Sequence, residues 1–225
     1  MPRIIQEGNL FFQRKGRRMV PIMPTHTQPT NGTVYTKSHS WKEDYIYVST
    51  INLWVSLERT YLQNQNWFDY HKIQNQGIRM PTLSEGIEYL KYFEANHQEI
   101  YKDIAEINPE PWRLECFDTI IDCHEGTSIS SEHTYEEGKI VPRYSETLDE
   151  DTLTCWKMIS LKDYMARAHT RQGLPRKDVK EGNFFYEGIY SPGIWVMGTH
   201  NHPYLGIHCP YNRNPILGVR TVRTE

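Results

Sequence analysis

The side chains best suited to bind a metal ion stand close together near the C-terminus. His200 and His202 are separated by one residue, and His208 and Cys209 follow soon after them. Imidazole and thiolate groups suit zinc, and alternate residues of a strand point to the same side. Structural zinc sites, however, draw four ligands from compact, recurrent spacings, and the sequence offers no second cluster of this kind. We therefore expect these histidines to serve a recognition surface, with no bound metal or other cofactor.

The segment around these histidines has the composition of a recognition surface. No Asp, Glu or Lys occurs from Gly188 to Thr224, although the rest of the chain is rich in all three. Tyrosine offers rigid contact area at low entropic cost, and Asn, Ser and Gly form adaptable hydrogen bonds, as in antibody loops. We expect Tyr204 and Tyr211 to be exposed, whereas Trp195 could serve either the core or the surface. The expected ligand contacts are Tyr190, Ser191, Trp195, Met197, Thr199, His200, Asn201, His202, Tyr204, His208, Tyr211, Asn212, Arg213 and Asn214.

The same residues share a property of the genetic code. Asn, His and Tyr codons differ only in the first base, so one template codon randomised at its adenines would produce this mixture. All of the expected contacts except Trp195 and Met197 are compatible with a diversified AAY codon. The segment is therefore predicted to be a binding surface that could be diversified.

Residues suited to catalysis occur elsewhere without a recognisable arrangement. No two carboxylates are placed to suggest acid–base chemistry, and we expect the acidic residues to lie on a solvated face. The pairs Cys123-His124 and Glu132-His133 are expected to be ordinary buried or loop residues. We therefore predict a protein that is not an enzyme. The acidic residues considered are Glu115, Asp118, Asp122 and Glu125.

Charge and cysteine content exclude several classes of protein. The net charge of -3 argues against general affinity for nucleic acid, and we expect the basic run from Arg14 to Arg18 to be a solvated terminus. The four cysteines include no C-x-x-C pair and are expected to be mostly buried thiols. No apolar run approaches the roughly 20 residues of a membrane span, and the first 24 residues lack the apolar centre of a signal peptide. We expect a soluble monomer, cytoplasmic or virion-associated, without nucleic-acid partners or membrane insertion.

The chain divides into an N-terminal arm over residues 1–40 and a domain over residues 41–225. Within the arm, Phe11, Phe12, Val20 and Ile22 could form a strand or two. A helix is expected from Thr50, with apolar residues at four-residue spacing over 53–61. The clearest start signal follows at 79–85, where an N-cap residue and an acidic residue three positions later form a capping box. The capping pair is Thr82 and Glu85, and the expected apolar stripe is Leu83, Ile87 and Leu90, with Tyr89 and Phe93 beside it.

The remaining elements are shorter. A helix is expected over residues 98–106 and another over 161–168, and short strands and exposed loops over 126–152. Apolar alternations broken by Gly and Pro predict antiparallel strands over 183–186, 194–197, 205–209 and 216–222. These last strands would carry the predicted binding surface.

Two fragments resemble a known family. Ile78-Arg79-Met80-Pro81-Thr82 with Glu85 resembles the R-L-P-T-x-x-E segment that opens the second helix of formylglycine-generating-enzyme-like domains, a branch of the C-type lectin fold. Leu217-Gly218-Val219-Arg220 resembles the G-F-R that closes those domains. The resemblance implies an α+β, C-type-lectin-like fold with two helices packed on small antiparallel β-sheets with long loops. It leaves an insertion at about 107–175.

Within that fold, the chain resembles the variable proteins of diversity-generating retroelements, including those of archaea and their viruses. In these proteins an adenine-mutagenic reverse transcriptase rewrites the C-terminal stretch, here about residues 188–220. Residues 111–113, 172–177 and 217–220 resemble the invariant frame around such a region. The resemblance implies a non-enzymatic recognition protein for varied protein or cell-surface ligands.

Two other classes of function stay open. A metal-dependent or oxidative enzyme of the same fold would use His200, His202, His208 and Cys209. Formylglycine-generating enzymes, however, depend on two closely spaced cysteines, and Cys209 stands alone. The triplets of calcium-dependent lectins are absent as well. A purely structural component is the third class, and a lack of exposed aromatic residues in the C-terminal loops would indicate it.

Overall fold

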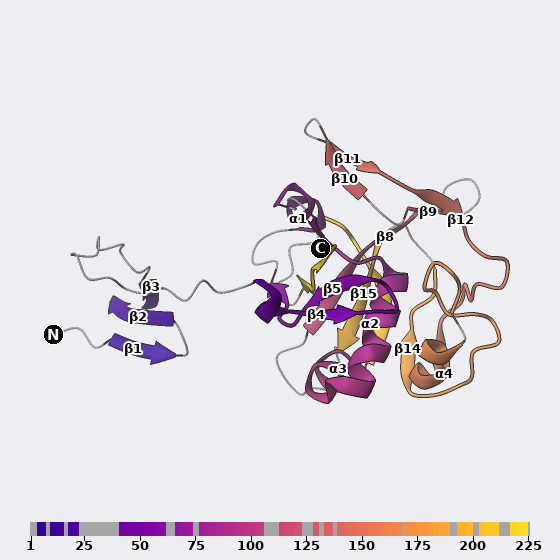
Figure 1. Cartoon of the computed structure of the whole chain (residues 1–225), viewed down its shortest axis with the longest axis horizontal. Helices are drawn as coiled ribbons and strands as arrows, with labels where there is room; N and C mark the ends of the chain where they lie inside the picture. The colour runs from indigo at the N-terminus through magenta and orange to yellow at the C-terminus, as the bar shows by residue number, and fades with distance from the viewer. Residues whose placement is uncertain are drawn as a thin grey trace. The chain divides into compact units, whose positions relative to one another are not determined.

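The computed structural model describes residues 4–7, 10–15, 18–22, 41–61, 66–73, 77–105, 113–122, 128–130, 133–136, 139–167, 169–189, 193–199, 203–211 and 217–224. The chain divides into two compact units, Met1–His39 and Ser40–Glu225. The first unit contains a three-stranded antiparallel sheet in the order β1-β2-β3 (Figure 1). Its strands are β1 (Ile4–Glu7), β2 (Leu10–Lys15) and β3 (Arg18–Ile22), so the residues expected to form strands in the arm lie in β2 and β3.

The second unit is built around a mixed sheet, which has nine strands within the described residues. The strands follow the order β12-β9-β8-β15-β16-β14-β13, and β17 pairs with both β8 and β6. Most pairs are antiparallel, but β14 runs parallel to β16 and β17 runs parallel to β8. The strands are β6 (Thr60–Tyr61), β8 (Arg113–Asp122), β9 (Ser128–Ser130), β12 (Ser145–Thr147), β13 (Lys157–Ile159), β14 (Phe184–Tyr186), β15 (Gly193–Thr199), β16 (Pro203–His208) and β17 (Leu217–Val219).

Two smaller sheets and the helices complete this unit. One sheet has the order β4-β5-β18-β7, and the other is the hairpin β10–β11. Their strands are β4 (Tyr45–Val48), β5 (Leu53–Ser56), β7 (Ile78–Arg79), β18 (Val222–Arg223), β10 (His133–Glu136) and β11 (Lys139–Pro142). The helices are the 3-10 helix η1 (Trp41–Asp44) and α1 (Trp67–Ile73), α2 (Leu83–Asn96), α3 (Gln98–Ala105) and α4 (Leu161–Ala166). The protein is therefore α+β, as predicted, with a mixed main sheet in place of small antiparallel ones.

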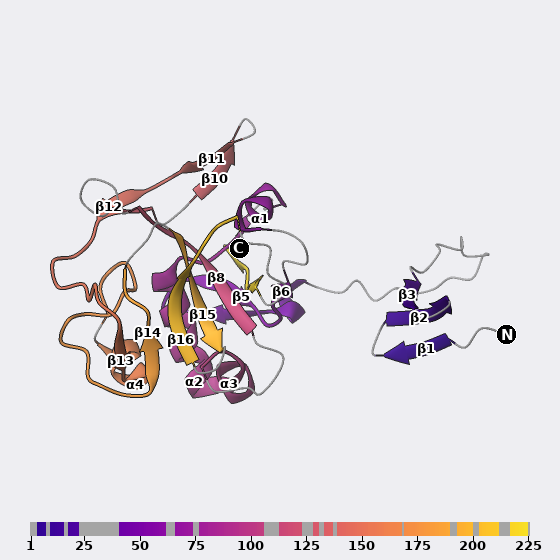
Figure 2. The same ribbon diagram turned by 180° about the vertical axis from the view of Figure 1, so that it is seen from behind.

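The central strands of the main sheet are covered on both faces. Alternate residues of a strand point to opposite faces. Trp195 and Met197 join one apolar cluster with residues of α2, while Ile194 and Val196 join a second cluster to which α1 contributes Trp67. Figure 1 shows α2 and α3 across one face of the sheet, and Figure 2, from behind, shows β15 and β16 in front of the same helices. The sheet is therefore a layer between α2 and α3 on one face and α1 on the other.

The start of α2 is the best-predicted element. The Thr82 hydroxyl accepts a hydrogen bond from the Glu85 N–H at 3.2 Å, and the Glu85 carboxylate accepts one from the Thr82 N–H at 2.8 Å. This is the predicted capping box. Arg79 adds a two-pronged ion pair to Glu85, at 2.7 and 2.6 Å. The predicted apolar stripe of α2 is buried, and the expected helices over 98–106 and 161–168 are confirmed as α3 and α4.

The helix expected from Thr50 is wrong. Residues 53–56 form β5, which pairs with β4 and β18, and residues 60–61 form β6. Asn52 has a φ of 53°, in the left-handed region suited to the turn between β4 and β5. Leu53 and Val55 are both buried on one side of β5. The four-residue spacing was therefore a coincidence, because its residues lie in β5, in the segment after it and in β6.

The sequence did not predict β8, the ten-residue strand at the centre of the sheet. Glu115 and Asp118 were expected on a solvated face, but each is only 1% exposed. They are buried because β8 lies between β9 and β15 and is covered on both faces. The side chain of Asp122 and all of Glu125 lie outside the described residues. Among the helices of the described residues, none has the length and apolar character that a membrane span requires.

A glycine of the predicted frame gives a test of this packing. Gly173 has a φ of 87°, and a Cβ there would lie 2.6 Å from the backbone nitrogen of Ser84 at the start of α2. Gly77 also has a positive φ, 80°, but a Cβ there would meet only a side-chain oxygen at 3.8 Å. Gly77→Ala should cost about 1 kcal/mol of unfolding free energy from backbone strain alone. Gly173→Ala should cost at least about 3 kcal/mol, because the backbone of α2 must also shift.

Urea denaturation of the two variants measures this difference directly. Equal losses of unfolding free energy at Gly173 and Gly77 would contradict the close approach of residue 173 to α2.

Candidate functional site

Two of the predicted contact residues, Trp195 and Met197 of β15, lie in the core. Trp195 and Met197 are 0% and 1% exposed, so the prediction that they contact a ligand at the surface is wrong. Trp195 stacks on Tyr186, with ring centroids 5.8 Å apart and planes inclined by 9°. Both residues are buried because β15 is flanked by β8 and β16 and covered by helices on the face to which they point. Thr199 is the last residue of the same strand.

Tyr204 is also buried, against expectation. It is 9% exposed and packs in the cluster on the α1 face of the sheet. Its hydroxyl is hydrogen-bonded to the Nε2 atom of His208 at 2.9 Å. Tyr204 and His208 point to the same face because they are four residues apart on β16. The two residues therefore form a partly buried, hydrogen-bonded pair.

Tyr211, in contrast, is exposed as predicted, with 69% of its surface accessible. It follows the end of β16, and its ring lies 4.7 Å from that of Phe68 on α1. The backbone N–H of Trp67 donates a hydrogen bond to the Pro210 carbonyl at 3.2 Å, which holds α1 against this end of the strand. We call the region formed by Phe68, His208, Cys209 and Tyr211 the β16 end.

The strand pairing places two described contact residues far apart. Ile194 pairs with His208 and Thr199 pairs with Pro203, so Thr199 and the β16 end lie at opposite ends of the paired strands. Five residues of extended strand span roughly 17 Å. The remaining expected contacts lie outside the described residues: Tyr190, Ser191, His200, Asn201, His202, Asn212, Arg213 and Asn214. Of the zinc candidates, only His208 and Cys209 are described.

A buried cluster that the sequence did not predict lies on the α1 face. Asp118 of β8 stands between His71 of α1 and His133 of β10. Its Oδ1 atom lies 3.3 Å from His71 Nε2 and 2.5 Å from His133 Nδ1, and its Oδ2 atom accepts the His133 N–H at 2.7 Å. The three side chains are 0%, 1% and 5% exposed for His71, Asp118 and His133. Trp67 packs on both imidazoles, with ring centroids 4.1 and 5.1 Å away.

The electrostatics of this cluster favour an ionised carboxylate. Burial by itself would raise the pKa of Asp118, because a charge in a dry interior is costly. The contacts of His133 and His71 outweigh burial and hold the pKa of Asp118 below its ordinary value. Within the described residues, these three form the one group of His, Cys, Asp and Glu side chains close enough to hold a metal ion. The cluster could hold a cation, or it could use Asp118 to orient the imidazole of His133.

No sequence signal marked this cluster. Its members come from a helix, a central strand and a separate hairpin, so their spacing in the chain follows no motif. His133 was expected to be an ordinary buried or loop residue, and Asp118 to be solvated. His71 received no prediction at all.

A second buried network lies on the α2 face of β8. The Glu115 carboxylate accepts a hydrogen bond from the Tyr89 hydroxyl at 2.6 Å and one from Arg220 Nε at 3.0 Å. Arg220 also donates to the carbonyls of Ser56, at 3.0 Å, and Leu57. Burial, followed by the charge of Glu115, raises the pKa of Tyr89, which therefore stays a neutral donor. The network ties the C-terminal motif to β8 and to the segment after β5.

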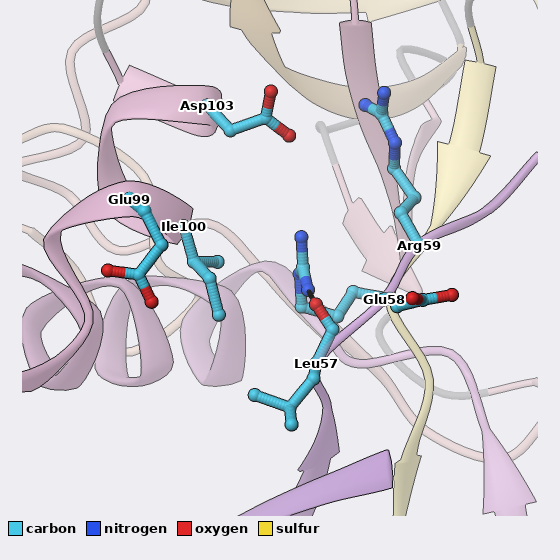
Figure 3. Close-up of a pocket in the computed structure, with 7 residues that line it drawn as sticks. Leu57, Glu58, Arg59, Glu99, Ile100 and Asp103 are labelled. Atoms are coloured by element: carbon cyan, nitrogen blue, oxygen red, sulfur yellow. Dashed lines mark hydrogen bonds between the residues drawn. The ribbon is translucent and has the colours of Figure 1, made fainter. Parts of the chain in front are cut away.

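A pocket of about 380 Å³ lies beside this network (Figure 3). Glu99, Ile100 and Asp103 of α3 face Leu57, Glu58 and Arg59 across it. Arg220 also lines the pocket, but its guanidinium group is already bonded to Glu115 and to two carbonyls. None of the described residues between 188 and 214 lines the pocket.

The cysteines differ from expectation. Cys116 is buried, and burial raises the pKa of its thiol to about 12. Cys155 and Cys209 are exposed, so the expectation of mostly buried thiols is wrong for the described residues. Cys123 lies outside them. Cys155 lies in a bend before β13, and Cys209 directly follows β16.

Comparison with known proteins finds no matching family model, no matching curated protein and no matching solved structure.

The Arg220 network yields a stability test. Arg220→Met removes the partner of a buried carboxylate and should lower the free energy of unfolding by about 3–5 kcal/mol. Arg167 provides the matched control, since its side chain is 56% exposed and its ion pair with Asp163 spans one helical turn. Arg167→Met should cost less than about 1 kcal/mol. Urea denaturation of both variants measures the contrast, and similar losses would show that Glu115 does not depend on Arg220.

Proposed function

We propose that this protein is a non-enzymatic recognition protein with a C-type-lectin-like fold, in which a retroelement diversifies the C-terminal segment at about 188–220. Its ligands would be proteins or cell-surface molecules. The observation that carries the proposal is the exposed ring of Tyr211, at the β16 end of a segment without carboxylates. Exposed aromatic residues with adaptable polar neighbours are typical of binding surfaces. A purely structural component would have no use for this ring in a C-terminal loop.

The division between buried and exposed residues supports diversification. Trp195 and Met197 are the two expected contacts that an AAY codon cannot produce, and both lie in the core. Tyr211 and His208 are compatible with that codon and lie at or near the surface. A diversified protein needs this arrangement, because a fixed core must tolerate every substitution made around it. Tyr204, which is compatible with the codon but buried, is the exception.

The relation between the two family-like fragments supports the proposed fold. They lie at distant positions in the chain, at 78–85 and 217–220. In the small sheet, β7 pairs with β18, so that Arg79 stands opposite Val222. Gly218 of the closing fragment pairs with Glu115 of the central strand. The first fragment therefore pairs with the strand that directly follows the second fragment, as in a single domain.

The segment at 172–177, expected to belong to the invariant frame, fits the same scheme. Gln172 and Leu174 are buried, and Gly173 lies against the start of α2. The enzyme alternative requires His208 as a metal ligand, and the Nε2 atom of His208 is hydrogen-bonded to Tyr204 instead.

Sequencing this gene across its natural population, with its genomic neighbourhood, tests the proposal. We expect substitutions to concentrate between residues 190 and 214 at template adenines, close to a reverse-transcriptase gene. Trp195 and Met197 should stay constant within this stretch. If residues 190–214 vary no more than the rest of the chain, the diversification proposal fails.

Substitution of individual residues tests the binding surface separately. Tyr211→Ser should change the free energy of unfolding by less than about 1 kcal/mol, because the ring is exposed and contacts chiefly Phe68. Trp195→Ala should cost about 3–5 kcal/mol, because it empties a site in the core. Chemical denaturation provides the measurement. A loss at Tyr211 comparable with that at Trp195 would assign Tyr211 a structural role.

A further inference from the structure

We propose that His71, Asp118 and His133 bind a divalent transition-metal ion, and that zinc is the ion their side chains fit best. Two imidazoles and one carboxylate are a donor set that zinc accepts in proteins, commonly with a water molecule in the fourth position. The site shares no residue with the C-terminal histidines and cysteine that the sequence suggested. It is also independent of the proposed recognition function.

The distances between the donor atoms are close to those of a shared ion. Two ligands at about 2.0–2.1 Å from a tetrahedral zinc ion stand roughly 3.3 Å apart. His71 Nε2 and Asp118 Oδ1 are 3.3 Å apart. His133 Nδ1 is closer to the same oxygen, at 2.5 Å, which is a hydrogen-bond contact. An ion that replaces the proton between these two atoms would move them roughly 0.8 Å further apart. A small side-chain rotation can produce this movement.

A second observation points to a missing partner. His71 is 1% exposed, and neither of its ring nitrogens has a hydrogen-bond partner among the described residues. Its contact with Asp118 has the length of an ion pair but lacks the direction of a hydrogen bond. A buried polar group without a partner costs about 1–3 kcal/mol, so native proteins rarely leave one. A metal ion bound at Nε2 would supply this partner.

The location explains what the ion would do. His71 lies on α1, Asp118 on β8 and His133 at the start of β10, so one ion would join three elements that are far apart in the chain. The helix α1 also carries Phe68, on which Tyr211 packs. An ion bound here would fix α1 and the β10–β11 hairpin to the central strand.

Metal titration of the full chain tests this inference. The protein is purified without a histidine tag, treated with EDTA and titrated with Zn²⁺ while binding is followed by calorimetry. We expect one equivalent of Zn²⁺ to bind. At a free Zn²⁺ concentration about 100-fold above the Kd, the Tm should rise by about 5–10 °C. A folded protein that binds no Zn²⁺ would overturn the proposal.

Variants identify the ligands. His71→Gln, Asp118→Asn and His133→Gln should each weaken Zn²⁺ binding by more than about 100-fold. His97 is the matched control, since it lies outside the cluster at the end of α2, and His97→Gln should bind as the wild type does. Binding that survives the three cluster variants would overturn the proposal. So would binding that disappears in Cys155→Ser/Cys209→Ser, because the ion would then be adventitious on the exposed thiols.

A spectroscopic measurement covers the case in which a cluster variant does not fold. Co²⁺ bound to the wild-type protein should give visible d–d bands without a thiolate charge-transfer band, because the proposed ligands are nitrogen and oxygen atoms. A thiolate charge-transfer band would place the ion on a cysteine and overturn the assignment.

Discussion

The burial of β8 on both faces is the constraint on which the rest of the structure depends. This strand carries two carboxylates into the interior, one toward each face, and a buried charge is tolerated only when it is paired and hydrogen-bonded. Glu115 meets this requirement with Tyr89 and Arg220 on the α2 face. Asp118 meets it with two hydrogen bonds from His133 and an ion-pair contact with His71 on the α1 face. The two acidic residues thus join several parts of the chain to the central strand.

Each of these partner residues belongs to a different part of the chain. Arg220 anchors the C-terminal segment between β17 and β18, and its bonds to the Ser56 and Leu57 carbonyls reach the end of β5. His71 joins α1 to β8, and His133 joins the β10–β11 hairpin to β8. Because the ion pairs lie inside, they contribute less to net stability than to the choice of which elements meet. Apolar contacts on both faces then supply most of the stabilising free energy.

The parts of the fold that the sequence predicted are those with local causes. The capping box of Thr82 and Glu85 marks the start of α2 through two hydrogen bonds within four residues, so it could be read directly. β8 could not be read in this way, because Glu115, Asp118 and Thr119 interrupt the apolar run of a strand that is buried on both faces. The helix expected around Leu53 failed for a related reason. Strand pairing with β4 and β18 determines the conformation there. The spacing of apolar residues within the segment does not reveal this pairing.

The candidate sites differ in the same way. Composition identified a segment rich in Tyr, His and Asn, but it could not separate Tyr204 from Tyr211. The position of each residue relative to the end of β16 separates them, since Tyr204 lies within the strand and Tyr211 beyond it. The buried cluster was missed because Asp118 and its histidine partners share no local pattern. Contacts of this kind become visible only when the topology of the sheet is known.

The hairpin β15–β16 shows how a fixed frame and a variable surface could share one element. Its side chains join the apolar clusters on both faces of the sheet, and this burial fixes the register of the two strands. The register therefore does not depend on the residues beyond the ends of the strands. A rigid support also lowers the entropic cost of binding, because the contact residues need little ordering. The pair Tyr204 and His208 tests the limit of this arrangement, because its hydrogen bond joins two positions that the same codon could change. Independent substitution would break that bond and leave a buried hydroxyl without its partner, at a cost of about 1–3 kcal/mol. Variation at 204 should therefore be coupled to variation at 208, whereas variation at 211 needs no such coupling.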